Sequence, residues 1–424
     1  MSGFKRELDD LQTKIDRGEQ LITGLAGEKT RWEASLIELD DQYEKLVGDC
    51  ILASAFMSYC GPFPSDYRDN LVANWKTTIE MEKIPFTLKF EFSEFMAGQA
   101  VAREWQMNGL PTDKFSFENG VFVTRGLRWA LNIDPQSQAN NWIKKMVGDQ
   151  LVIADYKDAN YIRKIESGIT LGKQVLFQDV EQEMDPMLDN VLNKAIIYIG
   201  KRMVVKLGGN DIEYHKNFKL YITTRMSNPH YTPEVSTKVV LVNFTVKESG
   251  LEEQCLGIVV RNEQPTIEQK KNQEVMNIAQ NKKTLIDLED KILRLLSESK
   301  GNLLEDVTLN ETLKTSKKTS EKVKNDLEAA EQTMKRIDET RETYRVCGRV
   351  ASILFFVLND LNKIDPMYQF SLDWYKKLFQ SSIVESGQQY GGDKIGNINK
   401  CHQIAVYRQA CRSLFEKHKL LLSL

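Results

Sequence analysis

Apolar residues recur every three or four positions along the first fifty residues of the chain. With Leu8 at position a of a heptad, the a and d positions up to Ala53 are apolar except Lys29 and Gly18. A 3.5-residue period keeps one stripe of a helix facing a partner helix. We therefore predict that residues 1–53 form one strand of a coiled coil. The seam expected to contact the partner consists of Leu8, Leu11, Ile15, Ile22, Leu25, Trp32, Leu36 and Leu39.

The alternative for this segment is an amphipathic helix lying on a globular core. The strict period favours a rod, and the positions between the seam residues are mostly charged or glutamine, which suits a solvated face. No second arm follows directly along the chain. The partner strand is therefore expected outside this chain or in a second copy of it.

Composition excludes several classes of protein. Lys and Arg number 57 and Asp and Glu 60, a net charge of -3, whereas a general nucleic-acid binder would show a basic excess. The six cysteines include no Cys-x-x-Cys pair, which argues against structural zinc and a disulfide scaffold. The longest nearly apolar run, residues 350–358, is far shorter than the roughly 20 residues of a membrane span.

The pattern changes after Gly61 and Pro62, which are expected to end the long helix. From residue 54 to 265, short apolar runs alternate with amphipathic helical stretches, an order that predicts a mostly parallel sheet covered on both faces. The fold class expected is α/β, a P-loop-like parallel sheet module with coiled-coil extensions. The expected strands are residues 121–124, 129–133, 175–179, 220–224 and 239–244. Residues 208–211 (GGND) read as a hairpin turn.

This strand and helix order calls for a test of nucleotide binding. A phosphate loop needs glycines that let backbone amides surround phosphate, a Lys for the outer phosphates and a hydroxyl for magnesium. Residues 134–142 stand in the right place but contain no Gly and no Lys, and Asp134 would repel phosphate. We therefore expect a degenerate pocket without hydrolysis. Its expected residues are Asp134, Pro135, Gln136, Asn140, Asp179 and Arg225.

Two of these residues have more than one interpretation. Asp179 stands where a magnesium-binding Asp would precede a Glu that polarises water, but the next residue is Val180. A structural carboxylate at a strand end is therefore favoured over a metal ligand. Arg225 either faces a nucleotide in a neighbouring module or pairs with a surface acid, and the second interpretation is favoured.

A second rod is predicted from residue 266 to 345. Its two arms carry apolar residues at steps of three, four or seven, and residues 299–302 (SKGN) are a turn signal, which together indicate an antiparallel helical hairpin. An arm of this length would reach about 50 Å. The expected seam is Leu285, Leu288, Ile292, Leu295, Val323, Leu327 and Met334.

The remainder is expected to be helical. Residues 346–395 contain a buried helix at 350–358, a break at Asp365 and Pro366, a helix at 367–379 and a flexible loop at 387–393. The end of the chain, residues 404–424, is expected to be a helix with an apolar tail.

Several segments carry a resemblance to a known family. The sequence resembles a dynein heavy chain of axonemal type over essentially its whole length, and the fifth AAA+ module of the motor ring in particular. The segments are residues 24–32 (GLAGEKTRW), 59–63 (YCGPF), 118–120 (ENG) with 123–126 (VTRG), 133–136 (IDPQ) with 138–140 (QAN), 223–225 (TTR) with 228–231 (NPHY), and 365–369 (DPMYQ). Ser137 stands where the family is expected to have Gly.

The resemblance implies a role for each part. It implies that residues 1–53 are the returning strand of the microtubule-binding stalk, 54–265 the large AAA+ subdomain and 266–345 the strut that supports the stalk. Residues 346–395 would be the small subdomain, and 396–424 the start of the sixth module.

The resemblance also implies a mechanical function. This chain would have no ATPase activity and no cofactor of its own, and ATP and Mg would act in other modules of the ring. The implied partners are those modules, the opposing stalk strand, the microtubule and dynein light and intermediate chains, in the cytoskeleton of the cilium. On this view the chain is a fragment or a truncated gene product. The alternative is a stand-alone coiled-coil scaffold with an inert α/β domain.

Overall fold

The computed structural model describes residues 2–298, 307–389 and 393–423, and only the backbone of some residues in α1, α10 and α11. The chain divides into two compact units. The first comprises residues 1–44 and 263–344, and the second residues 45–262 and 345–424. Within the described ranges, no helix combines the length and apolar character needed to cross a bilayer.

The second unit contains a five-stranded parallel sheet in the order β2-β3-β7-β1-β8. The strands are β1 (Trp129–Ile133), β2 (Leu151–Asp155), β3 (Gln174–Gln178), β7 (Lys219–Thr224) and β8 (Val239–Asn243). Four of the five strands expected from the sequence are confirmed, and β2 was not expected. Each connection between neighbouring parallel strands contains a helix, as parallel pairing requires.

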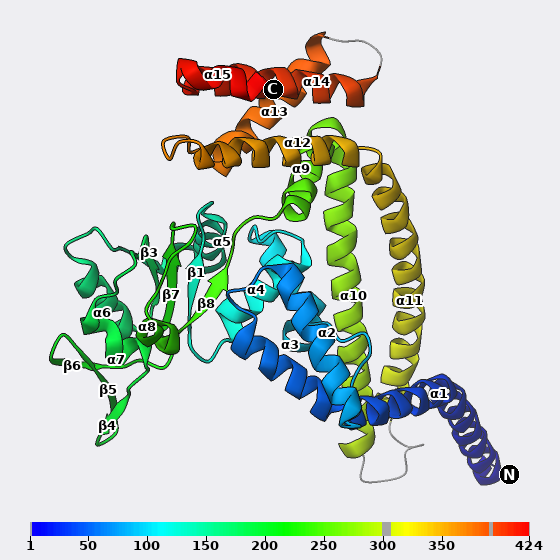
Figure 1. Cartoon of the computed structure of the whole chain (residues 1–424). Coiled ribbons are helices and arrows are strands. Elements are labelled where there is room, and N and C mark those ends of the chain that lie inside the picture. The colour runs from blue at the N-terminus through cyan, green and yellow to red at the C-terminus, as the bar shows by residue number, and fades with distance from the viewer. Residues whose placement is uncertain (1, 299–306, 390–392, 424) are drawn as a thin grey trace. The chain divides into compact units, whose positions relative to one another are not determined.

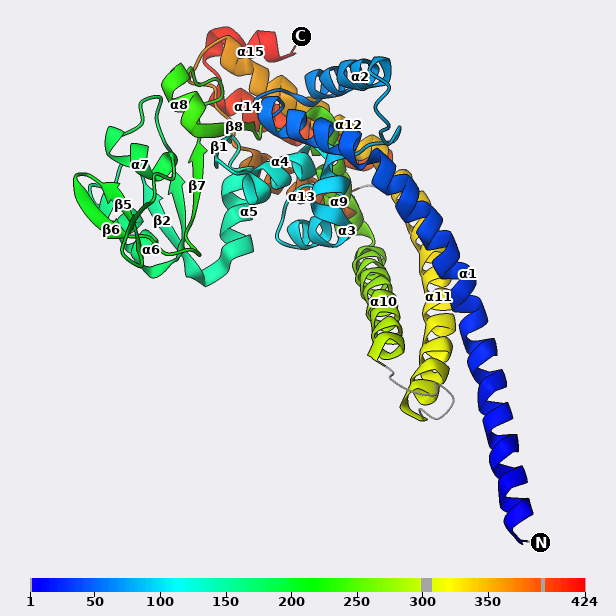
Figure 2. The ribbon, with the colours of Figure 1, turned by 90° about the horizontal axis from the view of Figure 1, so that it is seen from below.

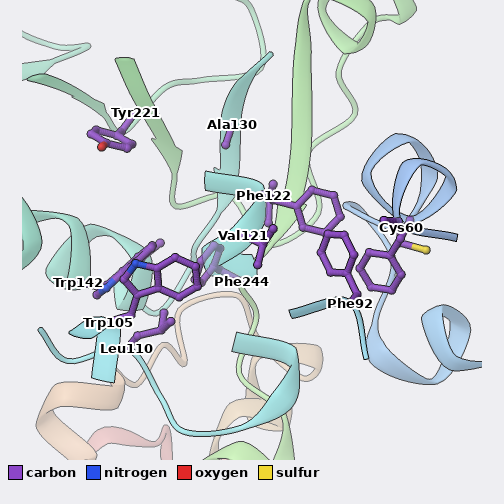
Figure 3. Packing of buried hydrophobic residues seen from close by; sticks show 14 of the residues in the cluster. Cys60, Phe92, Trp105, Leu110, Val121, Phe122, Ala130, Trp142, Tyr221 and Phe244 are labelled. Carbon is purple, nitrogen blue, oxygen red and sulfur yellow. The ribbon is translucent and has the colours of Figure 1, made fainter. Parts of the chain in front are cut away.

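Helices cover both faces of this sheet. Successive side chains of a strand point to opposite faces, so each strand contributes to two apolar clusters. On one face, Ala130, Leu176, Tyr221 and Val242 pack with Trp142 and Ile143 of α5 (Gln138–Val147). On the other face, Leu131, Phe177 and Ile222 pack with Ile165 and Ile169 of α6 (Tyr161–Leu171). Figure 3 shows part of the first cluster, with the rings of Trp105 and Trp142 close together.

A smaller antiparallel sheet and one short helix lie between β3 and β7 in the chain, and a second short helix lies between β7 and β8. The strands of this smaller sheet are β4 (Ile197–Ile199), β5 (Arg202–Leu207) and β6 (Asn210–Glu213), and the helices are α7 (Asp189–Leu192) and α8 (Pro233–Lys238). Gly208 and Gly209 join β5 to β6 with positive φ, which confirms the expected hairpin turn. Figure 1 shows this small sheet on the side of α6 and α7.

One expected strand is wrong. Residues 121–124 belong to α4 (Lys114–Arg125), which follows α2 (Ser65–Met81) and α3 (Phe92–Met107). Asp113 caps α4 by accepting a hydrogen bond of 3.0 Å from the Ser116 amide, and Phe115, Val121 and Phe122 form the buried face of the helix. A short apolar run does not by itself distinguish a strand from a buried helical face.

The first rod is a single helix, α1 (Ser2–Tyr59), which continues six residues beyond the expected end at residue 53 and stops before Gly61, as predicted. Among its seam residues, Ile15, Leu36 and Leu39 are more than half exposed and Trp32 is half-buried. The side chains of Leu8, Leu11, Ile22 and Leu25 lie outside the described part.

The second rod consists of α10 (Pro265–Glu298) and α11 (Val307–Glu342), which pack side by side in Figures 1 and 2, as the predicted hairpin requires. Its seam buries Ile278, Val323, Ala330 and Ile337 and half-buries Leu327 and Met334. The side chains of Leu285, Leu288, Ile292 and Leu295, and the predicted turn at 299–302, lie outside the described residues.

The last helices of the second unit are α9 (Glu248–Glu263), α12 (Arg345–Asp360), α13 (Leu372–Gln389), α14 (Lys394–Ser413) and α15 (Glu416–Ser423). Residues 350–358 lie in α12 as predicted, but residues 367–371 precede the helix expected there. The loop expected at 387–393 is wrong for residues 387–389, which end α13, and 390–392 lie outside the description. The helix expected from residue 404 begins at Lys394 and is interrupted at Leu414. Because α14 packs on α12 and α13, this unit continues across residue 396, and the assignment of 396–424 to a following module stays a prediction.

Two helical glycines provide a matched test of how closely α6 packs on the parallel sheet. A Cβ at Gly168 of α6 would lie 2.2 Å from Val175 Cγ2, whereas a Cβ at Gly257 of α9 would meet nothing within 4 Å. Gly168→Ala is expected to lower the free energy of unfolding by about 1–3 kcal/mol through overpacking. Gly257→Ala is expected to raise it by about 0.5–1 kcal/mol because alanine favours the helix. Urea unfolding of both variants tests this, and equal shifts of the same sign would contradict it.

Candidate functional site

The carboxyl ends of the parallel strands meet at one edge of the sheet, where open α/β folds bind their ligands. The residues at this edge are Asp155, Gln178 and Thr224, which end β2, β3 and β7, and Asp134, Asp179 and Arg225, which follow β1, β3 and β7. The Asp134 amide donates to the Thr224 carbonyl at 2.9 Å, and the Val180 amide to the Thr223 carbonyl at 3.1 Å. The backbone therefore holds the ends of β1, β3 and β7 in register.

Asp134 follows β1 and lies at the N-terminus of α5, the kind of position at which P-loop proteins bind phosphate. Its side chain is 1% exposed, and its Oδ1 and Oδ2 accept hydrogen bonds from the amides of Gln138 at 2.7 Å and Asn140 at 2.9 Å. These amides are at the N-terminus of α5, where free N–H groups and the helix dipole attract anions. The carboxylate therefore already satisfies the donors that a phosphate would need.

The negative charge of Asp134 also disfavours binding of a phosphate at the N-terminus of α5. Burial raises the pKa of Asp134 to about 6, even though the amides of α5 and the nearby Arg225 favour the charged form. At neutral pH the carboxylate is still mainly ionised, so it repels an approaching phosphate. Pro135 and Gln136 lie in the turn between β1 and α5. Ser137 closes this turn in a left-handed conformation with φ of 57°, and its amide donates a hydrogen bond of 3.2 Å to the Asp134 carbonyl.

Asn140 belongs to a second group of polar contacts at this edge. Its Nδ2 lies 3.4 Å from Gln178 Oε1, which also accepts from Lys144 Nζ at 3.2 Å. Gln178 Nε2 in turn donates to Asp155 Oδ2 at 3.0 Å. Gln178, Lys144 and Asp155 were not predicted as site residues from the sequence. Asp155 could have been predicted if β2 had been recognised as a strand, because its last residue lies at this edge.

Asp179 and Arg225 form an ion pair. Arg225 Nε lies 2.8 Å from Asp179 Oδ1, and Asp179 adopts a left-handed conformation with φ of 58° just after β3. The Arg225 side chain is 64% exposed, so the pair contributes little to stability. The structure therefore brings Asp179 and Arg225 together as a carboxylate and its counterion.

The residues of this edge do not fit a nucleoside triphosphate. The amides of Gln138 and Asn140 already donate to Asp134, and no lysine follows the strand at the position that would contact outer phosphates. Within the part of the chain that the structure describes, no three His, Cys, Asp or Glu residues are grouped to hold a metal ion.

The parallel sheet and its altered carboxyl edge define a P-loop-like AAA+ module with helical extensions. Residues 103–323 match the family described as the ATP-binding dynein motor region, and residues 4–79 match the microtubule-binding stalk of the dynein motor. The chain belongs to the dynein heavy chain family.

Individual relatives agree with this assignment. The chain is 50% identical over 418 residues to mouse dynein axonemal heavy chain 2, covering 98% of this chain and 9% of the relative. It is 50% identical over 421 residues to the Chlamydomonas reinhardtii dynein-1-beta heavy chain of the flagellar inner arm I1 complex, with the same coverage. Human dynein axonemal heavy chain 3 is 41% identical over 430 residues, which cover 100% of this chain and 10% of the relative. The chain thus spans a tenth or less of the length of these relatives.

Proposed function

We propose that this chain is a non-hydrolysing AAA+ ring module of a dynein motor, which passes ATP-driven ring movement to the microtubule-binding stalk. The observation that carries the proposal is Asp134, whose carboxylate accepts hydrogen bonds from the amides of Gln138 and Asn140 at the N-terminus of α5. A module that cannot receive phosphate there can still serve as a rigid body between moving neighbours. ATP and Mg then act in other modules of the ring.

The two rods supply the mechanical parts. The match of residues 4–79 to the dynein stalk supports α1 as one stalk strand, and the exposed Ile15, Leu36 and Leu39 leave a face for the opposing strand. The hairpin of α10 and α11 is proposed to be the strut that pulls on the stalk. A shift of heptad register between two stalk strands has discrete positions, as long-range coupling requires.

The proposed partners follow from this role. They are the other AAA+ modules of the same heavy chain, the opposing stalk strand, the microtubule through the stalk tip, and dynein light and intermediate chains. The relatives are named as axonemal heavy chains and as part of a flagellar inner arm, which supports a place in the axoneme and a role in ciliary or flagellar motility.

The chain is expected to show no ATP turnover of its own. Because Asp179 is paired with Arg225 and no phosphate cradle is free, Asp179→Ala should leave phosphate release at the background rate of the unmodified chain. Steady-state phosphate release by the purified chain and by this variant measures both. Turnover by the unmodified chain that Asp179→Ala abolishes would contradict the proposal.

A further inference from the structure

The guanidinium of Arg68 lies at the end of α1, inside the second unit. Arg68 belongs to α2 and is 1% exposed. Its Nε donates to the carbonyls of Cys60 and Phe63, both at 2.9 Å, and its Nη2 donates to the Gly61 carbonyl at 3.0 Å. One side chain therefore holds three carbonyls of the segment in which α1 ends.

The same guanidinium also binds the α/β core. Its Nη1 lies 3.0 Å from Glu118 Oε2 and its Nη2 2.8 Å from Asn119 Oδ1, both on α4. Asn119 Nδ2 donates to the Asn243 carbonyl, at the end of β8, at 2.7 Å. The Asn243 amide returns a bond of 3.0 Å to the Gly61 carbonyl. The end of α1 is thus connected to the sheet through Arg68 and directly.

Close packing surrounds this cluster. The guanidinium carbon lies 4.3 Å from the centre of the Phe115 ring, in a cation–π arrangement. A Cβ at Gly61 would lie 2.3 Å from the Leu241 carbonyl oxygen, so the backbone after α1 touches β8 itself. Figure 3 shows Cys60 beside Phe92, in the cluster that includes Phe122.

A second attachment lies earlier on α1. The buried carboxylate of Asp49 accepts from the Thr87 amide at 2.9 Å and from Thr87 Oγ1 at 2.7 Å. At Gly48 the backbone approaches so closely that a Cβ would lie 2.3 Å from the Pro85 carbonyl oxygen. Asp49 and Cys60 are about 16 Å apart along a helix. Two attachments at that separation fix the direction of residues 45–59 of α1 as well as their position.

The chemistry of Arg68 favours a positioning role over a purely stabilising one. A buried Arg–Glu pair can often be replaced by apolar side chains without loss of stability. Hydrogen bonds from a planar guanidinium, in contrast, fix the orientation of each acceptor. The pair of Arg68 and Glu118 therefore sets the geometry between three segments: the end of α1, α4 and β8.

We propose that Arg68 is a positioning residue that holds the last part of α1, residues 45–59, at a fixed angle to the sheet, so that this part of the stalk helix and β8 move as one body within the second unit. The inference rests on the proposed force-transmitting function. It identifies the contacts through which movement of the module would be passed to the stalk helix. We call these contacts, which Arg68 makes with residues 60, 61, 63, 118 and 119, the joint.

Spin-label distances within the 424-residue chain test the joint without requiring motor activity. One label is placed on Ser58→Cys, exposed near the end of α1, and the other on Lys219→Cys of β7, with Cys50→Ser and Cys411→Ser to remove the accessible thiols. The variant is Arg68→Met with Glu118→Met, which removes both buried charges and keeps apolar volume. Its distance distribution is expected to be about twice as wide as that of the unmodified pair, through local opening.

The control is Lys114→Met, which removes a half-exposed lysine 4.0 Å from the same Glu118 carboxylate but leaves the guanidinium contacts in place. It should keep the narrow distribution. Circular dichroism melting establishes that the double variant is folded. A folded double variant with a distribution as narrow as the unmodified pair would overturn the joint.

The full-length heavy chain separates the joint from the proposed function. The double variant should lose most of the microtubule stimulation of ATPase while keeping basal turnover, and Lys114→Met should keep both. If the distance distribution widens but stimulation is unchanged, the joint exists and its role in force transmission is wrong. If the distribution stays narrow and stimulation is unchanged, the joint itself is refuted.

Discussion

Proline at position 287 of α10 is expected to abolish the stimulation of ATPase by microtubules in a full-length motor that contains this chain. Asp287 is exposed in the middle of a helix that runs from Pro265 to Glu298. Proline there removes a backbone hydrogen bond and costs about 3 kcal/mol or more. The hairpin would then bend beyond the packed Ile278, Val323 and Ile337 and could not transmit a pull.

Asp287→Ala is the matched control, since it removes the same side chain and favours the helix. Turnover is measured with and without microtubules in both variants. Basal turnover should be the same in both, because hydrolysis is proposed to occur in other modules. The strut role is refuted if Asp287→Pro is stimulated as strongly as Asp287→Ala.

The sequence was a good guide where a residue pattern had one structural solution. The runs at 129–133 and 220–224 are bounded by turn residues, and both are central strands of the sheet. The apolar run at 121–124 had two solutions. It became a helical face because Asp113 caps α4 and the run continues the side that carries Phe115. β2 lies at the edge of the sheet, is less completely buried and was missed.

The candidate site shows the same limit. The residue types in 134–142 predicted a degenerate phosphate pocket, which stays a prediction, and the structure places Asp134 at the N-terminus of α5. That its carboxylate turns back onto the amides of α5 depends on side-chain geometry, which a sequence does not specify. The contact between Gln178 and Asp155 required knowing that β2 pairs with β3. Arg68 gave no signal, because a single Arg in an amphipathic helix is ordinarily a solvated residue.

Acid is expected to destabilise the second unit through His402, which belongs to α14, is 1% exposed and packs with Phe379 of α13. The Tyr375 hydroxyl donates to the Ala351 carbonyl at 2.6 Å, so at 2.8 Å it accepts from His402 Nε2. His402 Nδ1 lies 3.3 Å from Ser382 Oγ, and the Phe379 ring packs 4.7 Å away. Burial lowers the pKa of His402 to about 4, so the neutral imidazole is favoured in the folded unit.

The direction of the effect follows from the two pKa values. The unfolded chain binds a proton at a pKa of about 6.5, and the folded unit only near 4. The contribution of His402 is therefore complete above pH 6.5 and is lost as the pH falls toward 4. Between pH 7 and 4.5 the loss amounts to about 2 kcal/mol. His402→Gln, which stays neutral and can still donate to Tyr375, should remove that part of the pH dependence.

Urea unfolding at pH 7 and pH 4.5 measures the difference. The exposed His230 provides the matched control, because His230→Gln changes the same chemical group without a buried environment. That variant should lose as much stability on acidification as the unmodified chain, whereas His402→Gln should lose about 2 kcal/mol less. An equal loss in all three proteins would mean that His402 is protonated in the folded unit, and the packing of α13 on α14 would then have to accommodate a buried imidazolium.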